Sequence, residues 1–396
     1  MDNNKRQLIY ITIIIVLLTL SIRASNNMIM TTIPLVAKYD LKFSETLVGL
    51  ISATIAFFTF IASGLINSRL HVSLRRKVFI ASNVGFAILM PLFYLSNLIT
   101  IWLISALTGF VLGFIMPNII TSAGLVEDRR ARERLLSIYT LALSISLVIG
   151  PAIESLILKY FSLREVFLFF TPFGLLSVAL SPFIRFPSNE DRTSNHITNV
   201  WSNNGFKVAV FNILSYNVPF AFILTFGGIY AKDQFNASYS LITSLFALFF
   251  TTSLLARLFL SIKPVERIWH GVLFSIAMSI IGLTLMLFSR NILIYALALI
   301  ILGFPHGLTY PFSIISISRT FKPQERNAAN SMFFSIMMLI GVVTPFVTGF
   351  IVDEIGIRTT FGLLIPVILL MLVLIGKYVK YVDNIEPKIS QTKVNT

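Results

Sequence analysis

The sequence contains no cysteine and few charged residues. Of its 396 residues only 12% are Asp, Glu, Lys or Arg, whereas soluble domains contain about 25%. The absence of cysteine excludes disulfides, thiolate nucleophiles and cysteine-ligated metals. The four histidines have no paired spacing, and no phosphate-binding or dinucleotide-binding motif occurs. The sequence therefore predicts no metal site, no cofactor and no nucleotide chemistry.

Apolar residues are abundant instead. They make up 56% of the chain and include 36 Phe, more than a soluble core could hide from water. A membrane-spanning helix needs about 20 apolar residues. The sequence predicts an all-α polytopic membrane protein with twelve spans near 8–36, 45–66, 77–96, 99–125, 135–158, 165–185, 205–231, 239–261, 269–288, 291–317, 328–350 and 359–379.

The net charge of +14 has a topological explanation. Most Lys and Arg residues fall in the two terminal segments and in alternate loops, which the positive-inside rule places in the cytoplasm. We therefore expect both termini to be cytoplasmic. Contact with anionic lipid accounts for the remaining basic residues, so we predict no nucleic-acid partner. We expect a monomer in the lipid bilayer of the cytoplasmic membrane.

The two halves of the sequence repeat each other at a constant offset of 194 residues. The matching pairs are Gly109 and Gly303, Gly113 and Gly307, Pro117 and Pro311, and Arg164 and Arg358. Because basic loops fall on the same side in both halves, the halves are parallel copies with six spans each. This arrangement holds a substrate between the halves. The predicted division is a first bundle at 1–185, a cytoplasmic linker at 186–204, a second bundle at 205–380 and a cytoplasmic tail at 381–396.

These features resemble the major facilitator superfamily, and within it the twelve-helix drug–proton antiporters. That group carries a Gly-Pro motif in its fifth span, matched here by Gly150 and Pro151, and a loop motif after the second span, matched by Gly64 and Arg69. Ser105 stands where the group usually carries Arg. The resemblance implies hinge or gating roles for the four matching residues. Proline bends a helix and small residues permit close helix approach, so an ordinary kinked packing helix is the alternative.

Polar residues within the spans are candidates for the substrate site, because they are costly in lipid. Arg23 lies near the middle of the first span and would bind an anionic or hydrogen-bonding substrate. The alternative is a structural arginine paired with backbone carbonyls or with Glu154. The resemblance implies that spans one, four, seven and ten line the cavity, and the candidates fall on these spans: Arg23, Asn26, Asn27, Asn118, Tyr216, Asn217, His306 and Tyr310.

Two residues could couple transport to protons. Glu154 is the only carboxylate expected inside a span, and His306 can change charge near neutral pH. A static hydrogen-bonding role remains the alternative for each. We expect Arg257, near the inner end of the eighth span, to extend to the membrane interface and to have a structural role.

Together these patterns predict a secondary active transporter for a small organic compound, with proton-coupled efflux as the favoured mode. Few fixed charges among aromatic and aliphatic residues suit an amphipathic or weakly anionic substrate. The alternatives are symport or uniport uptake of a nutrient such as an organic acid or sugar, or a membrane sensor without transport. We do not expect an enzyme, because no catalytic groups cluster at either membrane face.

Overall fold

The computed structural model describes residues 3–126, 128–186, 199–262, 266–322 and 325–383. Within these ranges every regular element is helical. Most of the predicted linker and of the predicted tail fall outside the described residues.

Six helices form the first half: α1 (Asn3–Leu35), α2 (Glu45–Phe60), α3 (Val72–Tyr94), α4 (Thr100–Gly124), α5 (Arg129–Ile157) and α6 (Glu165–Leu180). A π-helical turn, Val36–Asp40, extends α1, and another, Ile61–Ile66, extends α2. The second half contains α7 (Asn204–Phe235), α8 (Tyr239–Ile262), α9 (Ile268–Phe288), α10 (Ile292–Thr320) and α11 (Arg326–Asp383).

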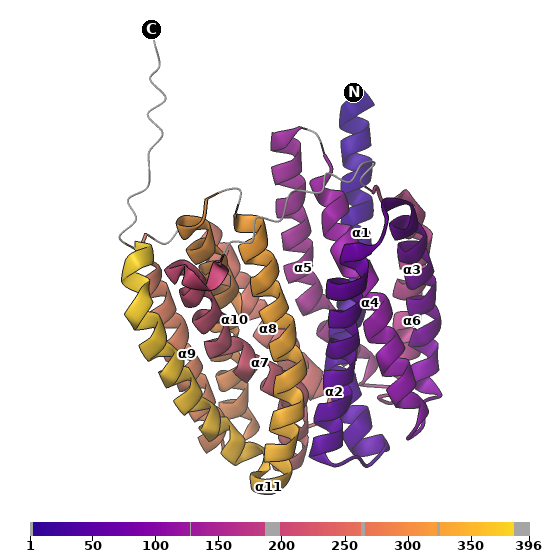
Figure 1. The fold of residues 1–396 in the computed structure, drawn as a ribbon. Coiled ribbons are helices and arrows are strands. Elements are labelled where there is room, and N and C mark those ends of the chain that lie inside the picture. Colours follow the sequence, from indigo (N-terminus) through magenta and orange to yellow (C-terminus); the bar gives the residue numbers. More distant parts are fainter. Residues whose placement is uncertain (1–2, 127, 187–198, 263–265, 323–324, 384–396) are drawn as a thin grey trace.

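Gly356 divides α11 into two membrane-spanning helices. Eleven segments are long and apolar enough to span a membrane, and the last, Ala328–Asp383, has 56 residues, enough for two crossings. The backbone of Gly356 has a φ of 81°, a left-handed conformation that favours glycine. The chain reverses there, so twelve spans are present (Figure 1). The sequence predicts a loop at 351–358 between the last two spans. In the structure helix continues on both sides of Gly356, and the chain reverses at this one residue without a loop.

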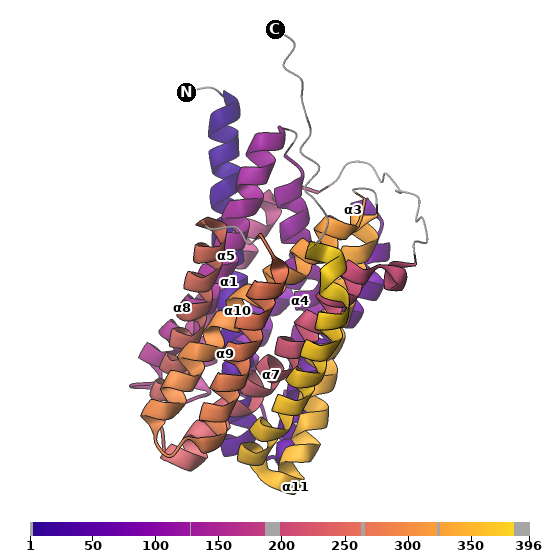
Figure 2. The ribbon, with the colours of Figure 1, turned by 90° about the vertical axis from the view of Figure 1, so that its left-hand side faces the viewer.

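The first residues of α1 and the last residues of α11 lie at the same end of the bundle (Figures 1 and 2). An even number of crossings requires this arrangement. We call this end the terminal end and the other the distal end.

The predicted repeat is present in the helix contacts. A Cβ atom at Gly109 would overlap the carbonyl oxygen of Ile55, and one at Gly303 would overlap that of Phe249. All four residues obey the offset of 194, so α4 packs on α2 as α10 packs on α8. Glycine is needed here because the helix backbones touch.

A pair of arginines repeats in the same way. Arg164 donates from Nε to Asp40 at 3.0 Å, and Arg358 donates to the Oε1 atom of Gln234 at 3.2 Å. Asp40 and Gln234 are also separated by the offset. The duplication therefore includes side-chain contacts as well as helix positions.

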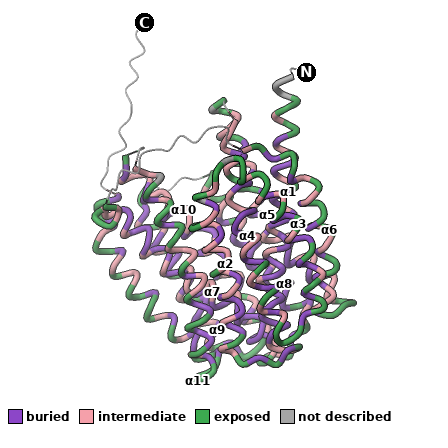
Figure 3. Tube along the Cα trace, turned by 45° about the vertical axis from the view of Figure 1, so that its right-hand side comes forward, coloured by how far each residue is buried: buried purple, intermediate pink, exposed green. Residues whose placement is uncertain are grey.

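Four helices are buried most deeply. At least half of the most apolar stretch is buried in α1, α4, α7 and α10, compared with at most 44% in the other candidate spans. Exposed residues lie mainly toward the periphery (Figure 3). These exposed side chains include large hydrophobic ones such as Leu103, Leu255 and Phe259, at 62%, 58% and 64%, a surface suited to lipid. The four helices expected to line a cavity are thus the central ones.

The two halves meet along two seams. In one seam α2 packs against α11, and in the other α5 packs against α8. The two seams are related by the repeat, since each joins the second helix of one half to the fifth span of the other.

Candidate functional site

Arg23 lies on a half-buried face of α1. Asn26 and Met30 share this face at helical spacing, whereas Ala24 and Ser25 are buried. Arg23 forms no hydrogen bond or ion pair with any residue that the structure describes. The pairing with Glu154 considered from the sequence is not formed.

Glu154 is completely buried between α5 and α1. Its carboxylate oxygens accept hydrogen bonds from the hydroxyl groups of Thr31 and Thr32, at 2.7 and 2.6 Å. Within the described ranges no cation pairs with it. Each carboxylate oxygen therefore has a hydrogen-bond donor, and neither donor carries a charge.

His306 lies midway along α10 in an aromatic environment. Its Nδ1 atom is 2.8 Å from the hydroxyl oxygen of Ser253 on α8. The rings of Phe220, Phe249 and Phe250 surround the imidazole at centroid distances of 4.4, 5.3 and 5.4 Å. His306 is thus an ordered hydrogen-bonding group next to the contact between α8 and α5.

Arg257 does not extend to the membrane interface as expected. Its guanidinium donates to the hydroxyl of Ser144, midway along α5, at 3.1 Å, and approaches the carbonyl oxygen of His306 at 3.5 Å. Its Nε atom is buried and has no hydrogen-bond partner among the described residues. The side chain turns inward because polar groups of both halves lie there. Its position joins the two halves.

The candidate residues of α7 and α10 divide into two kinds. Asn217 is half-buried and, like Arg23, forms no hydrogen bond with a described residue. Tyr216 is buried and donates to the carbonyl oxygen of Leu302 at 2.7 Å, which fixes α7 to α10. Tyr310 packs near Phe333 of α11.

The asparagines of α1 and α4 also differ from each other. Asn118 donates its amide to Asn67 at 2.9 Å and to the carbonyl oxygen of Phe114, which joins α4 to the segment after α2. The structure does not bring Asn118 together with Arg23. Asn27 is buried, and its side-chain nitrogen has no described partner.

Three polar residues near the site were missed by the sequence prediction. Thr31 and Thr32 were overlooked because hydroxyl groups are common in spans. Asn212 on α7 donates to the hydroxyl of Ser313 at 2.9 Å, and its own Oδ1 atom is buried without a described partner. The polarity of Asn212 within a span was an available signal.

The predicted hinge residues occupy two different environments. A Cβ atom at Gly150 would lie 2.6 Å from the carbonyl oxygen of Ala24, so Gly150 and the buried Pro151 bring α5 against α1 of the same half. Gly64 and Arg69 are exposed near the end of α2. The side of α5 that carries Gly150 therefore packs against α1 of the same half.

Several further hydrogen bonds between the halves lie at the distal end. Tyr39 donates to Asp233 at 2.7 Å, and Asp353 accepts from the backbone of Thr46 at 2.8 Å. Ser155 of α5 donates to the carbonyl oxygen of Ser240 at 2.9 Å. These bonds close the distal end of the bundle.

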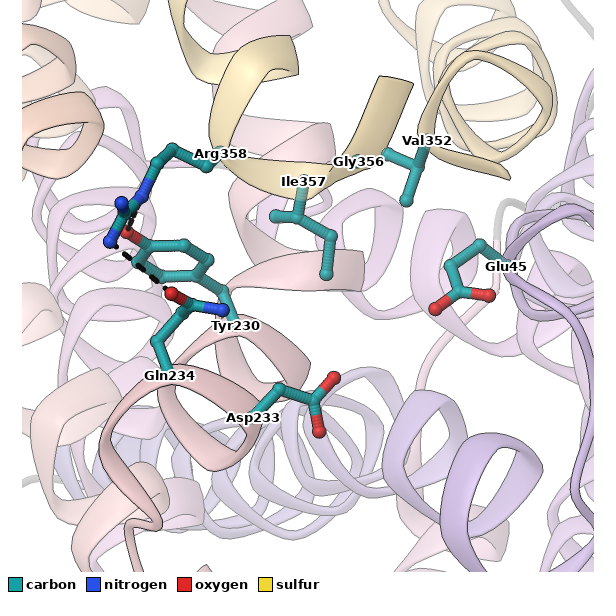
Figure 4. A pocket seen from close by; sticks show the side chains of 8 residues that line it. All are labelled: Glu45, Tyr230, Asp233, Gln234, Val352, Gly356, Ile357 and Arg358. Carbon is teal, nitrogen blue, oxygen red and sulfur yellow. Dashed lines mark hydrogen bonds between the residues drawn. The ribbon is translucent and has the colours of Figure 1, made fainter. Parts of the chain in front are cut away.

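A pocket of about 230 Å³ also lies at the distal end, where both halves contribute (Figure 4). Its lining residues are Glu45, Tyr230, Asp233, Gln234, Val352, Gly356, Ile357 and Arg358. Arg358 is held there by Tyr230 and Gln234, both at 3.2 Å. This pocket is separate from the polar groups around Arg23 and His306.

Twelve spans in two repeated halves, with polar groups between them, define a transporter fold. The model of the Major Facilitator Superfamily matches residues 15–262 and again 206–393, and the chain belongs to this family. The family transports small molecules across lipid bilayers, and this chain is a multi-pass membrane protein.

Solved transporters have similar folds. A mutant of the nucleoside transporter NupG matches with a TM-score of 0.76 and 13% identity, over 93% of this chain and 99% of that one. A bacterial homolog of the human lysosomal transporter Spinster, in an inward-facing and occupied conformation, matches with a TM-score of 0.67 and 14% identity, over 96% of each chain. At these identities the likeness shows the fold alone.

A curated relative matches part of the sequence. The protein TsgA homolog of Buchnera aphidicola subsp. Schizaphis graminum (strain Sg) is 25% identical over 155 residues, which are 38% of this chain and 40% of that protein. The match thus spans less than half of either protein.

Proposed function

We propose that the chain is a secondary active transporter of the cytoplasmic membrane, acting as a monomer with both termini in the cytoplasm. It moves a small amphipathic or weakly anionic compound by alternating access, and export coupled to proton entry is the proposed mode. Arg23, Asn26 and Asn217 contact the substrate.

The observation that carries this proposal is the unpaired guanidinium of Arg23. A charge within a membrane is costly unless it is paired or hydrated. Because the described residues give Arg23 no partner, a polar group of the substrate can supply one without displacing a protein contact. Glu154 supports the coupling, since the hydrogen-bond donors that the described residues give its carboxyl group are two uncharged hydroxyl groups.

Substitution of Arg23 tests the site. We expect Arg23→Ala to reduce transport in proteoliposomes by about 10- to 100-fold, the effect of losing one charged hydrogen bond. Arg6→Ala is the matched control, because Arg6 is exposed at the terminal end of the same helix. Wild-type rates in Arg23→Ala would remove Arg23 from the substrate site.

Direction is tested separately with inverted membrane vesicles. If the protein exports its substrate in exchange for protons, adding the substrate dissipates an imposed proton gradient. Alkalinisation outside intact cells on adding the substrate would instead show symport, as expected for uptake of an organic acid. This second candidate is favoured by the same cationic residue.

A further inference from the structure

Arg257 is a cation inside the bundle, and no acidic residue that the structure describes forms an ion pair with it. Of its five N–H groups, one donates to Ser144 and one approaches the carbonyl oxygen of His306. Its Nε–H has no partner in the described part of the chain, and no carboxylate there pairs with the guanidinium. Charge in this position is costly unless something compensates it.

The repeat shows that the fold does not need this charge. The residue that matches Arg257 in the first half is Ser63, and the residue that matches Ser144 in the second half is Met338. The hydroxyl of Ser63 contacts the sulfur of Met338 at 3.5 Å. The same contact between halves is thus made in the other seam by neutral side chains, so the arginine has a purpose beyond packing.

The surroundings of Arg257 suit an aromatic anion. Tyr310 follows His306 by one turn of α10 and lies within electrostatic range of the guanidinium, and its hydroxyl forms no hydrogen bond with a described residue. The carbonyl oxygen of His306 lies 3.5 Å from the guanidinium, and the imidazole of His306 packs against the half-buried ring of Phe220 at 4.4 Å. A planar guanidinium binds a carboxylate through two parallel hydrogen bonds, and neighbouring rings can stack on an aromatic group.

We propose that Arg257 anchors the carboxylate of an aromatic organic acid at the seam between α5 and α8, with Tyr310 donating a second contact. This assignment rests on the proposed transport function and names its substrate class. Arg257 also joins the two halves through its hydrogen bond to Ser144. The bound carboxylate would therefore be held by a residue that connects the halves.

The test measures binding to the purified full-length protein, independently of transport. Benzoate and larger aromatic carboxylates are each compared with the neutral amide of the same shape. We expect the wild type to bind a carboxylate at least tenfold more tightly than its amide, and Arg257→Gln to lose this preference. Arg257→Lys should retain part of it. Arg290→Gln, which removes an exposed arginine, should leave it unchanged.

A second variant guards against misfolding. The double substitution Arg257→Ser with Ser144→Met transplants the neutral contact of Ser63 and Met338, which this fold already accommodates. It should fold and bind carboxylate and amide equally. An undiminished carboxylate preference in this variant or in Arg257→Gln would overturn the assignment, as would a wild type that prefers no carboxylate.

Transport of the same compounds separates this assignment from the proposed function. Carboxylate preference lost with Arg257, without transport by the wild type, would uphold the binding site and refute the transport function. Transport that is insensitive to Arg257→Gln would uphold transport and refute the anchor.

Discussion

Asp353 holds the two halves together at the distal end. This exposed residue of α11 accepts hydrogen bonds from the backbone N–H groups of Glu45 and Thr46, at 3.0 and 2.8 Å, and from the hydroxyl of Thr46. It thus caps the first turn of α2 from the other half, beside the cap that Ser44 provides to Leu47 at 3.3 Å. Because the bond joins α11 of one half to α2 of the other, it can form only when the halves meet at the distal end.

Removing this cap should favour the distally open conformation. Loss of a helix-capping side chain costs about 0.5–2 kcal/mol. Because the cap contributes only to the closed state, Asp353→Ala should lower the ratio of closed to open molecules by about 2- to 30-fold. Glu354→Ala is the matched control, because Glu354 is an exposed neighbouring carboxylate that forms no bond with a described residue.

The absence of cysteine allows a direct measurement. Spin labels on Ile99→Cys and Leu293→Cys would stand at repeat-related positions that begin α4 and α10, where the side chains are 80% and 76% exposed. Double electron–electron resonance then reports the distance between the halves at the distal end. We expect Asp353→Ala to increase the longer-distance population. An unchanged distribution, or an equal change in Glu354→Ala, would refute the capping argument.

Two further predictions concern the first half. Glu154→Gln keeps the shape of the side chain but cannot release a proton. Transport by this variant, measured over a range of pH, should therefore lose its pH dependence. An unchanged pH profile would exclude Glu154 as the proton carrier. Gly150→Ala places a methyl group 2.6 Å from the carbonyl oxygen of Ala24 and should destabilise the protein by about 1–3 kcal/mol, seen as a lower melting temperature. Gly64→Ala is its control, since the nearest atom there is 3.7 Å away; equal melting temperatures would contradict the close approach.

The fold could be predicted from the sequence because its signals are periodic and repeated. Apolar runs fixed the spans, and the offset of 194 residues fixed the two like-facing halves. The error at Gly356 has a local cause. One glycine with positive φ reverses the chain, and its neighbours Asp353 and Arg358 look like loop residues although helix surrounds them.

The site could be predicted only in part, because sequence gives the depth of a residue but not the rotation of its helix. Arg23 and Asn118 are both polar residues of central helices, yet one is without a described partner and the other is satisfied within its own half. Glu154 could be predicted as a site residue because a charged side chain within a span is visible in the sequence. Thr31 could not, because only its hydrogen bond to Glu154 in the structure shows its importance.

The two seams obey one symmetry but differ in chemistry. In the α2–α11 seam Gly49 lies against the backbone of Pro345 so closely that a Cβ atom would overlap its carbonyl oxygen. The α5–α8 seam carries hydroxyl groups, among them Ser155, together with Arg257 and, on the adjoining face of α5, Glu154. Both seams carry hydroxyl groups, but the α2–α11 seam joins the neutral side chains of Ser63 and Met338 where the α5–α8 seam has Arg257 and Ser144. A charged group can exchange its bonds for hydration. We therefore expect the α5–α8 seam to be hydrated during the transport cycle.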